Sequence, residues 1–545
     1  MASLDKRIAR VACESFGWDE LRPGQAEAAG AVIAGRDALA VMSTGYGKSA
    51  IYQIAALLIP GPTVVVSPLI ALQREQVEEL EEQGVGGAAN VNSTVGETER
   101  REAFEDLEDD ALEFVFMAPE QLANEDVQDE LRAAEPSLFV VDEAHCISEW
   151  GHDFRPDYLK LGAVAESLGR PPILALTATA SPPVREEIVA RLGMRDPALF
   201  VRGFDRPNIW LGVERFRDEE VKDRALIERV VDEPKPGIVY AATRRGAEQH
   251  AAELREAGVD ALAYHGGMNK GDREAAQQRF MDDDLEVIVA TTAFGMGVDK
   301  PNVRFVFHSE VADSVDSHYQ EVGRAGRDGE PARAVLFYRP EDLGLRRFFA
   351  GSGQVDLEEI QRVADAVAEH GGPVDPVELR DETSLSQTKL TTAVSRLEDV
   401  GAVEVLPTGE VAPTGDVPVA DEETLERAVD AQENREEFDR SRIEMIRVYA
   451  ELDDGCRRDF VLNYFGQTFD PPCGACDNCD AGRVSARAAD GPFASGERVV
   501  HDKWGAGVVQ RIEGDQIVVL FDSVGYKKLG VDLVVERELL APEAG

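Results

Sequence analysis

The chain has 545 residues, too many for one hydrophobic core, so we expect several domains. Its 104 acidic residues outnumber the 57 basic ones and give a formal net charge of −47, which excludes binding of phosphate-rich partners through a generally basic surface. It has neither an apolar run long enough to span a membrane nor a signal-peptide core at its N-terminus. These features predict a cytoplasmic protein without a membrane partner.

Lysine is scarce, with only 11 in the chain. An acidic, Lys-poor surface suits a salt-rich cytoplasm, where ions shorten the range of self-repulsion. A generally acidic proteome explains the same composition, and both explanations stay open. In either case we expect contacts with anionic ligands to be confined to local clusters of Arg.

The first two thirds of the chain predict two successive lobes. Within residues 1–204, apolar runs such as ALAVM, LFVVDEA and PILALTATA are typical of buried parallel strands, and REQVEELEEQ is typical of a helix between them. The pattern restarts within residues 205–345, with GIVYAAT, EVIVATTAFG and ARAVLFY. This alternation predicts an α/β fold of two doubly wound parallel sheets.

The remaining residues predict three smaller domains. Residues 355–415 hold three helical patterns and a short apolar hairpin, the outline of a winged helix. Residues 420–482 begin with an acidic linker that passes into long helices and end in clustered cysteines. Residues 492–545 alternate Val with Gly and polar residues, which predicts a small β-barrel.

A phosphate-binding motif, VMSTGYGKS, lies between a predicted strand and a predicted helix. Backbone N–H groups of such a loop surround phosphates, while Lys48 reaches the β and γ oxygens and Ser49 ligates Mg²⁺. Met42 stands where the strict motif has Gly. The predicted nucleotide-binding residues of the loop are Thr44, Gly45, Tyr46, Gly47, Lys48 and Ser49.

A pair of carboxylates follows another apolar strand, at Asp142 and Glu143. In this position Asp142 would hold Mg²⁺ and Glu143 would polarise the attacking water. The phosphate loop and the acid pair together predict nucleotide hydrolysis, with ATP and Mg²⁺ as cofactors.

The residues around these motifs resemble the RecQ DNA helicases of superfamily 2. The similar segments are FGWDELRPGQ, VVVSPLIALQREQV, DEAHCISEWGHDFRPDY, TATA, AYHGGM, VIVATTAFGMGVDKPNVRFVFH and YQEVGRAGRDG. They occur in the family's order over residues 4–340, and the resemblance resumes over residues 434–480. It implies two RecA-like lobes and an ATP-dependent helicase that moves 3′→5′ on single-stranded DNA and unwinds forked DNA in repair and recombination.

The resemblance also implies roles for residues outside the phosphate loop. Arg22 and Gln25 would grip adenine, because an amide offers both a donor and an acceptor to the base edge. Arg327 would be the arginine finger and Arg324 a γ-phosphate contact. An exposed polar turn and a solvated Arg pair are the simpler alternatives.

An aromatic-rich loop follows the acid pair and would couple DNA to hydrolysis. Its predicted DNA-binding residues are Trp150, His152, Phe154 and Arg155. Bases stacked on these aromatic rings would signal to the acid pair through a few residues. Packing of Trp150 and Phe154 in the core is the alternative. Thr177 and Thr179 resemble a coupling motif but would serve equally as helix caps.

Four of the six cysteines lie close together, at Cys456, Cys473, Cys476 and Cys479. Thiolates at this spacing suit tetrahedral Zn²⁺, and their context resembles the zinc segment of RecQ proteins. An iron–sulfur cluster is the alternative. Cys13 and Cys146 are expected to be small buried residues.

Two features depart from the family pattern. The winged-helix candidate precedes the cysteines instead of following them, so its role in splitting duplexes is open. The last residues resemble the Tudor-like module that ends UvrD- and PcrA-type helicases. With His501, Lys503, Trp504, Lys527 and Lys528, this module would dock a protein partner, bind nucleic acid, or cover apolar surface of the motor.

The sequence as a whole predicts an ATP-dependent DNA helicase of the cytoplasm, associated with the nucleoid. A superfamily 2 RNA helicase or remodelling ATPase is the first alternative. An ATP-gated DNA-binding protein that does not unwind is the second, although it would not need Lys48, Glu143 and Arg327 together.

Overall fold

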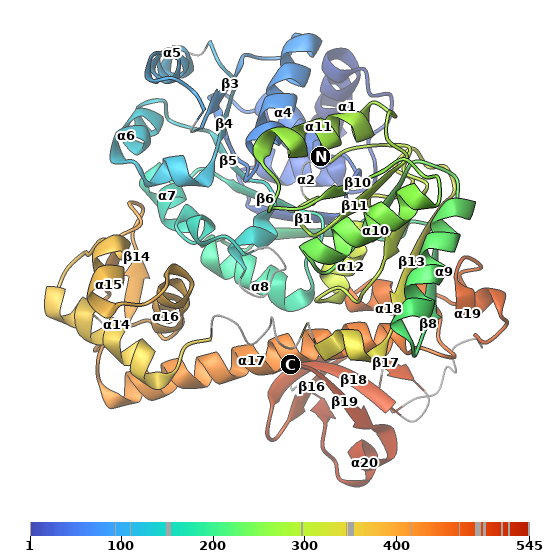
Figure 1. Ribbon diagram of the computed structural model, residues 1–545. Helices are drawn as coiled ribbons and strands as arrows, with labels where there is room; N and C mark the ends of the chain where they lie inside the picture. Colours follow the sequence, from blue (N-terminus) through green and yellow to red (C-terminus); the bar gives the residue numbers. More distant parts are fainter. Residues whose placement is uncertain are drawn as a thin grey trace. The chain divides into compact units, whose positions relative to one another are not determined.

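The structure is a computed structural model of the whole chain (Figure 1). It describes residues 2–92, 94–109, 111–148, 154–295, 298–344, 346, 354–415, 417–467, 469–484, 492–493, 497–513, 516–521 and 524–542. These residues form two compact units, Met1–Arg202 with Ser352–Arg435, and Gly203–Gly351 with Glu436–Gly545.

The first unit contains a seven-stranded, wholly parallel sheet in the order β3-β4-β2-β5-β6-β1-β7. Its central strands are short apolar runs that are buried along their whole length, as expected where helices cover both faces. The strands are β1 (Ala38–Met42), β2 (Thr63–Val66), β3 (Ala88–Val91), β4 (Phe114–Met117), β5 (Leu138–Val141), β6 (Ile173–Thr177) and β7 (Ala198–Arg202).

The helices of this lobe alternate with its strands (Figure 1). They are α1 (Ala2–Phe16), α2 (Gln25–Ile33), α3 (Ser49–Ala56), α4 (Ile70–Gln83), α5 (Glu97–Glu108), α6 (Glu125–Ala133), α7 (Leu161–Ser167) and α8 (Pro182–Arg191). The order of the strands matters for function, because β6 lies between β1 and β5. The carboxyl ends of these three parallel strands therefore lie next to one another on the same side of the sheet.

The second unit contains a six-stranded parallel sheet in the order β10-β11-β9-β12-β13-β8. Its strands are β8 (Ile209–Arg215), β9 (Gly237–Tyr240), β10 (Ala261–Tyr264), β11 (Val287–Ala290), β12 (Phe305–His308) and β13 (Ala332–Tyr338). Its helices are α9 (Glu219–Asp232), α10 (Arg244–Glu256), α11 (Lys270–Met281) and α12 (Val315–Val322). The two predicted parallel sheets are thus confirmed.

Residues 354–415 contain the predicted three helices and hairpin. The elements are α14 (Leu357–His370), α15 (Pro376–Thr383), α16 (Gln387–Asp399), β14 (Val403–Val405) and β15 (Val411–Pro413), the two strands antiparallel. A core of their own, which includes Val363, Val367, Leu390 and Leu397, holds them together. Asp356 and Glu359 form a capping box that fixes the start of α14.

The acidic run passes into a long helix as predicted, but the expected linker before that helix is wrong, because α17 (Glu422–Ala450) already begins at residue 422. Its sequence lacks Gly and Pro throughout and is rich in Glu, Arg and Ala, which favour a helix. Two short helices follow, α18 (Arg457–Tyr464) and α19 (Asp477–Asp480). Among the helices that the structure describes, none has the length and apolar character needed to cross a membrane.

The C-terminal residues form a five-stranded antiparallel sheet in the order β19-β18-β17-β16-β20. Its elements are β16 (Arg498–His501), β17 (Gly505–Glu513), β18 (Gln516–Phe521), β19 (Gly525–Gly530), α20 (Val531–Glu536) and β20 (Ala541–Pro542). In the described residues β19 and β20 stand at opposite ends of this order and do not pair. The expected closed barrel is therefore not found in this part of the chain, where the described strands form an open sheet.

Some of the basic and aromatic residues expected on the surface of this tail contact other residues of the protein. Trp504 is half-buried and stacks on His501 with ring centroids 4.2 Å apart. Lys527 donates to Glu437 of α17 at 2.8 Å. Cys13, expected to be buried, is exposed, whereas Cys146 is buried as predicted.

Candidate nucleotide site and zinc site

The phosphate loop joins β1 to α3 in the first lobe. Gly45 and Gly47 have φ angles of 76° and 77°, which only glycine adopts without strain. Lys48 donates from Nζ to the carbonyl of Met42 at 3.2 Å, so its side chain folds back over the loop. Ser49 is the first residue of α3, whose unpaired N–H groups and dipole favour an anion at this end.

Arg22 and Gln25 lie against the same loop. Gln25 is 4% exposed, and its amide donates to the carbonyls of Tyr46 and Gly47 at 3.0 and 2.8 Å. Arg22 donates to the carbonyl of Gly45 at 2.5 Å, and its guanidinium lies 5.5 Å from the centre of the Tyr46 ring. Both residues thus hold the phosphate loop in shape, and contact of Gln25 with adenine stays a prediction.

The acid pair stands at the end of β5, two strands away from β1. Burial, aided by the Glu143 carboxylate and opposed by Lys48, raises the pKa of Asp142 to about 7. Glu143 has a φ of 47°, a left-handed conformation that is rare for a residue with a side chain. Such strain is concentrated at functional sites, where surrounding contacts maintain it.

A buried chain of polar contacts leads from Glu143 to the neighbouring strand. A Glu143 oxygen lies 3.3 Å from Nδ1 of His145, which in turn lies 2.9 Å from the hydroxyl of Thr177. Thr177 ends β6 and also donates to the carbonyl of Thr179 at 3.1 Å. Thr177 therefore contacts the acid pair's own turn instead of serving only as a helix cap. Sequence reasoning missed His145 as a site residue, although it is the last residue of the DEAH run.

The aromatic-rich loop begins and ends on that turn. Ser148 directly follows the 3₁₀ turn Ala144–Ile147, and the N–H of Arg155 donates back to the carbonyl of Cys146 at 2.8 Å. The Arg155 side chain donates to the carbonyl of Pro68 at 3.0 Å, while Phe154 is half-buried. Trp150 and His152 lie outside the described residues.

Arg324 and Arg327 are largely buried in the second lobe. Arg327 donates to the carbonyl of Val298 at 2.9 Å and to Asp299 at 2.5 Å. Arg324 is 5% exposed and lies 3.4 Å from the carbonyl of Val298. Burial, partly offset by Asp299, lowers the pKa of Arg327. A solvated Arg pair, the simpler alternative, does not match this burial.

The loop that carries these two arginines is held by residues that sequence reasoning missed. Arg206 donates to the carbonyls of Gly323, Ala325 and Gly326 at 3.0, 2.8 and 2.9 Å. Asn208 donates to the carbonyl of Gly326 at 2.8 Å. Because these contacts use main-chain carbonyls, they fix the path of the loop and leave its side chains to act. The run FDRPNIW offered no recognisable pattern for this role.

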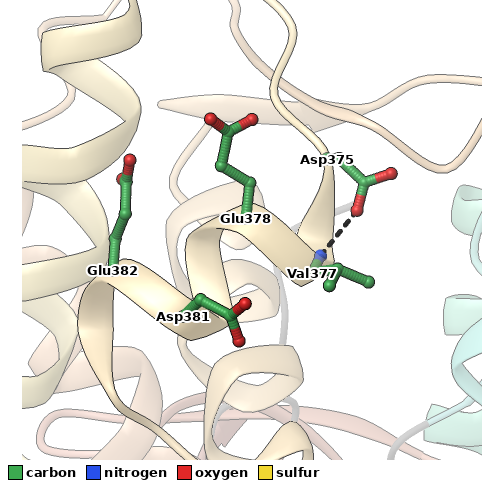
Figure 2. Close-up of a pocket in the computed structure, with 5 residues that line it drawn as sticks. All are labelled: Asp375, Val377, Glu378, Asp381 and Glu382. Atoms are coloured by element: carbon green, nitrogen blue, oxygen red, sulfur yellow. Dashed lines mark hydrogen bonds between the residues drawn. The ribbon is translucent and has the colours of Figure 1, made fainter.

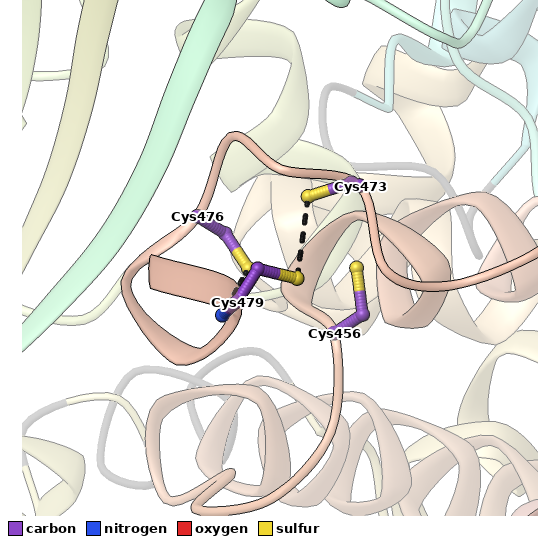
Figure 3. Close-up of side chains that lie close together, drawn as sticks. All are labelled: Cys456, Cys473, Cys476 and Cys479. Atoms are coloured by element: carbon purple, nitrogen blue, oxygen red, sulfur yellow. Dashed lines mark hydrogen bonds between the residues drawn. The ribbon is translucent and has the colours of Figure 1, made fainter. Parts of the chain in front are cut away.

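The four clustered cysteines converge in the second unit, as Figure 3 shows. Their sulfur atoms all lie within 4.8 Å of one another, and those of Cys473 and Cys479 are 3.8 Å apart. Zn–S bonds of about 2.3 Å in a tetrahedron place sulfur atoms about 3.8 Å apart, so the four residues fit Zn²⁺.

The zinc segment packs on β8, the edge strand of the second sheet. Leu211 donates from its backbone to the carbonyl of Ala475 at 3.2 Å, and Val213 donates to the Asp477 carboxylate at 3.1 Å. The indole of Trp210 donates to Asp480 at 2.7 Å. An uncovered strand edge invites pairing with other chains, so the segment also protects the sheet.

Two buried arginines of α18 contact the zinc segment and the residues around β8. Arg457 is 1% exposed and forms a two-armed ion pair with Asp477. Arg458 donates to Asp205 at 3.0 Å and to the carbonyl of Ile209 at 2.7 Å. Asp477 lies next to the ligand Cys476, and Ile209 is the first residue of β8. Metal binding by the cysteines and packing of the zinc segment on the sheet therefore depend on the same arginines.

Family models match these regions separately. The DEAD/DEAH box helicase model matches residues 22–188, the helicase conserved C-terminal domain residues 221–329, and the RecQ zinc-binding model residues 419–480. The last match, with the sulfur geometry, favours zinc over an iron–sulfur cluster. The fold and these sites define an ATP-using helicase motor with a zinc-binding segment.

Similar proteins identify the family. The probable ATP-dependent DNA helicase RecS of Bacillus subtilis is 34% identical over 479 residues, which are 87% of this chain and 92% of that protein. The ATP-dependent DNA helicase RecQ of Pasteurella multocida is 43% identical over 328 residues, or 60% of this chain and 51% of that protein. The chain belongs to the RecQ family of ATP-dependent DNA helicases, as the sequence motifs predict.

Solved structures agree on the fold. Mss116p bound to single-stranded RNA and AMP-PNP superposes with a TM-score of 0.52 at 17% identity, covering 72% of this chain and 88% of that one. The DUF1998 helicase MrfA bound to DNA also gives 0.52 at 17% identity, covering 77% of this chain and 60% of that one. Neighbours this distant support two RecA-like lobes and nothing narrower.

Proposed function

We propose that this helicase moves 3′→5′ along single-stranded DNA and splits forked duplexes of the nucleoid during repair and recombination. One observation carries the proposal. The aromatic-rich loop leaves and rejoins the turn that bears Glu143, through Ser148 and the Arg155–Cys146 hydrogen bond. DNA bound by the loop would thus move the groups that act on ATP. The RecS and RecQ relatives are named DNA helicases, which supports DNA over RNA as the substrate.

The residues of the first lobe would divide the work on ATP. Lys48 would bind the β and γ phosphates, while Ser49 and Asp142 would hold Mg²⁺, which supplies Lewis-acid charge when bound. Glu143 would orient the water and take its proton. Arg22 and Gln25 would meet adenine once the amide of Gln25 releases the loop carbonyls.

In the second lobe, Arg324 and Arg327 would contact the γ-phosphate. Arg327 would first have to exchange Asp299 for the phosphate. A guanidinium makes both contacts with the same planar donors, so the exchange needs no change of protonation.

Strand displacement tests the proposal directly. We expect the purified protein with ATP to unwind forked and 3′-tailed duplexes and to leave 5′-tailed duplexes intact. Trp150→Ala should retain ATP affinity and lose DNA stimulation, with a stacking loss of about 1–3 kcal/mol per base. Stimulation by RNA alone would support the RNA helicase, and hydrolysis without strand separation would support the ATP-gated binder.

We further propose that residues 355–415 form a winged helix that does not bind DNA through α15. Figure 2 shows Glu378 and Glu382 extending to the same side of this helix, while the carboxylate of Asp381 points away from theirs. Asp375 already caps the helix by accepting from the N–H of Val377 at 2.7 Å. Carboxylates on this face would repel DNA phosphates.

The C-terminal sheet is proposed as a Tudor-like module that docks a protein. Lys503 and Lys528 are exposed, whereas Trp504 and Lys527 already have partners within the protein. A single half-buried Trp offers little stacking area for nucleic acid, so a partner with an acidic surface fits better.

A further inference from the structure

A short segment between β7 and β8, residues 204–209, holds the arginine loop, residues 323–327. Arg206 donates from both Nη atoms to three main-chain carbonyls of this loop, and Asn208 donates to one of them at 2.8 Å. The accepting carbonyls belong to Gly323, Ala325 and Gly326. A planar guanidinium presents its donors in fixed directions, so Arg206 sets the orientation of the loop as well as its distance.

The other side of the 204–209 segment is attached to α18. Arg458 of this helix is 4% exposed, and it donates to the carboxylate of Asp205 at 3.0 Å and to the first carbonyl of β8 at 2.7 Å. The buried ring of Phe204 stacks on that of Phe465, which directly follows α18, with centroids 4.6 Å apart. The segment therefore contacts α18 and the arginine loop through different side chains.

The helix that leads into the arginine loop, α12, is attached at the same place. It packs on α18, and the Tyr464 hydroxyl donates to the carboxyl group of Asp316 in its first turn. The Tyr319 hydroxyl donates to the carbonyl of Phe204. All of these side chains are buried, where hydrogen bonds are electrostatically stronger than in water. The start and the end of the arginine loop are thus both positioned relative to α18.

The arginine loop also fits closely against the 204–209 segment. Gly326 has a φ of 56°, and a Cβ atom there would lie 2.5 Å from the amide nitrogen of Asn208 and 2.7 Å from the carbonyl of Glu330. Closely packed groups transmit a displacement instead of absorbing it, so a shift of the segment would shift the loop. A misplacement of about 1 Å at a reacting group can cost about 100-fold in rate.

We propose that Arg206 is a positioning residue for ATP hydrolysis, which aligns the arginine loop relative to α18. This inference rests on the proposed contact of Arg324 and Arg327 with the γ-phosphate. Arg206 acts through the main chain of the loop, so it affects the transition state more than the binding of ATP or DNA. Because α18 begins directly after Cys456, the zinc segment and the arginine loop share this support.

Turnover and nucleotide binding by the full-length protein test the proposal. Arg206→Gln should lower kcat for DNA-stimulated hydrolysis about 20-fold or more, while the KM for ATP stays within about threefold of the parent. Affinity for ADP–aluminium fluoride, which resembles the phosphoryl group in transfer, should fall about tenfold or more, and affinity for ADP should stay within about twofold. Arg206→Lys keeps the charge without the planar donors and should recover only part of the loss.

A matched control separates this role from ordinary packing. Arg255 also donates to a main-chain carbonyl of the second lobe, that of Ala261 at 3.0 Å. Arg255→Gln should leave kcat and binding of ADP–aluminium fluoride unchanged, because its acceptor lies outside the arginine loop.

Two further variants probe each side of the 204–209 segment. Asn208→Ala removes a smaller contact with the arginine loop and should lower kcat about fivefold at an unchanged KM, which gives an answer even where Arg206→Gln unfolds the lobe. Asp205→Ala removes the acceptor of Arg458 and should also lower kcat at an unchanged KM, with the zinc content of the parent. Normal kcat in Asp205→Ala would refute the role of α18.

Normal kcat in Arg206→Gln, or equal losses of affinity for ADP and for ADP–aluminium fluoride, overturns the proposal. Arg327→Ala separates it from the function on which it rests. Normal hydrolysis in Arg327→Ala would refute the contact with the γ-phosphate. Loss of hydrolysis there, with normal turnover in Arg206→Gln and Asn208→Ala, would refute only the positioning role.

Discussion

The imidazole Nδ1 of His145 lies 2.9 Å from the hydroxyl of Thr177, and this contact joins the turn of the acid pair to the neighbouring strand. Both side chains are fully buried. The hydroxyl also donates to the carbonyl of Thr179, so it ties β6 to the segment that leads into α8. Contacts through His145 and Thr177 therefore link Glu143 to the segment that leads into α8.

Thr177→Val should break this path while keeping shape. We expect ATP affinity to stay the same and DNA-stimulated turnover to fall about tenfold, because a buried hydrogen bond with its unsatisfied partner is worth about 1–3 kcal/mol. Thr63→Val is the control, since the buried Thr63 hydroxyl has no hydrogen-bond partner among the described residues. Steady-state ATPase with and without DNA measures both. Equal losses of DNA-stimulated turnover in the two variants would show that removal of any buried hydroxyl lowers turnover, and would contradict a specific role for Thr177.

Lys48→Ala and Glu143→Gln should both stop turnover, for different reasons. Lys48→Ala removes a charge from the phosphates and should weaken nucleotide binding by about tenfold or more. Glu143→Gln keeps binding and loses the group that takes the water's proton, so turnover should fall about 100-fold or more. Fluorescent-nucleotide titration and ATPase assays separate the two, with exposed Lys6→Ala as the charge control. Normal hydrolysis in either variant contradicts the assigned roles.

The parallel sheets were predictable because their central strands are uninterrupted apolar runs such as ALAVM and LFVV. The edge strands β7 and β8 were not, since β7 is half-exposed and β8 interrupts its apolar residues with Gly, Glu and Arg. The first part of helix α17 was mistaken for a linker because its acidic surface hides the buried apolar positions, such as Leu425 and Ala428.

The candidate site was predictable where chemistry demands particular side chains, as at Lys48, Asp142 and the four cysteines. Residues that act by holding main-chain carbonyls, such as Arg206, carry no such signature. Contacts between distant segments, such as Arg191 with Glu398, depend on packing that no local pattern encodes.

Cys473→Ser should release the metal and destabilise the second unit. Ligation energy is folding energy in such segments, and the loop that bears Cys473 also covers β8 through the Leu211–Ala475 hydrogen bond. We expect the zinc content, measured by elemental analysis, to fall below the value of about one zinc per chain in the parent protein. We also expect the melting temperature to drop by several degrees. Exposed Cys13→Ser should change neither. Iron with visible absorbance in the parent protein would contradict the zinc assignment.

Stability should fall as pH rises through neutrality because of a buried pair in the second lobe. Oε2 of Glu321 lies 2.8 Å from Nε2 of His308. Burial, reinforced by Asp313, raises the pKa of Glu321 from 4.5 to about 8, and burial lowers the pKa of His308 from 6.5 to about 3. Near pH 7 the pair is therefore a protonated carboxyl and a neutral imidazole.

The sign of the pH dependence follows from these shifts. Glu321 has a raised pKa, so its contribution to stability is complete below 4.5 and is lost as pH rises towards 8. His308 has a lowered pKa, so its contribution to stability is present above pH 6.5 and is lost as pH falls from 6.5 towards 3. Between pH 6.5 and 8 we expect the free energy of unfolding to decline by up to about 1.4 kcal/mol per pH unit. Urea unfolding should show this slope, and Glu321→Gln should flatten it; an unchanged slope would assign it to other groups.

The C-terminal sheet should be separable from the motor. It docks in the second unit where the Tyr526 ring stacks on Tyr464 at 5.1 Å and the Tyr526 N–H donates to Ser441 at 3.1 Å. Gly525 has a φ of 71° and leaves no room for a Cβ, which would lie 2.4 Å from the Ser441 hydroxyl oxygen. Gly525→Val should therefore undock the sheet without removing it.

Deleting residues 490–545 should leave DNA-stimulated ATPase and unwinding within about twofold of the parent, because the nucleotide and zinc residues lie elsewhere. Both the deletion and Gly525→Val should lower the melting temperature, since Tyr464 becomes exposed to water. Only the deletion should abolish binding of an acidic protein partner, because Gly525→Val keeps Lys503 and Lys528. If the deletion instead loses most DNA affinity, with a shallower dependence on salt, the sheet is a DNA-binding module and the protein-docking proposal is wrong.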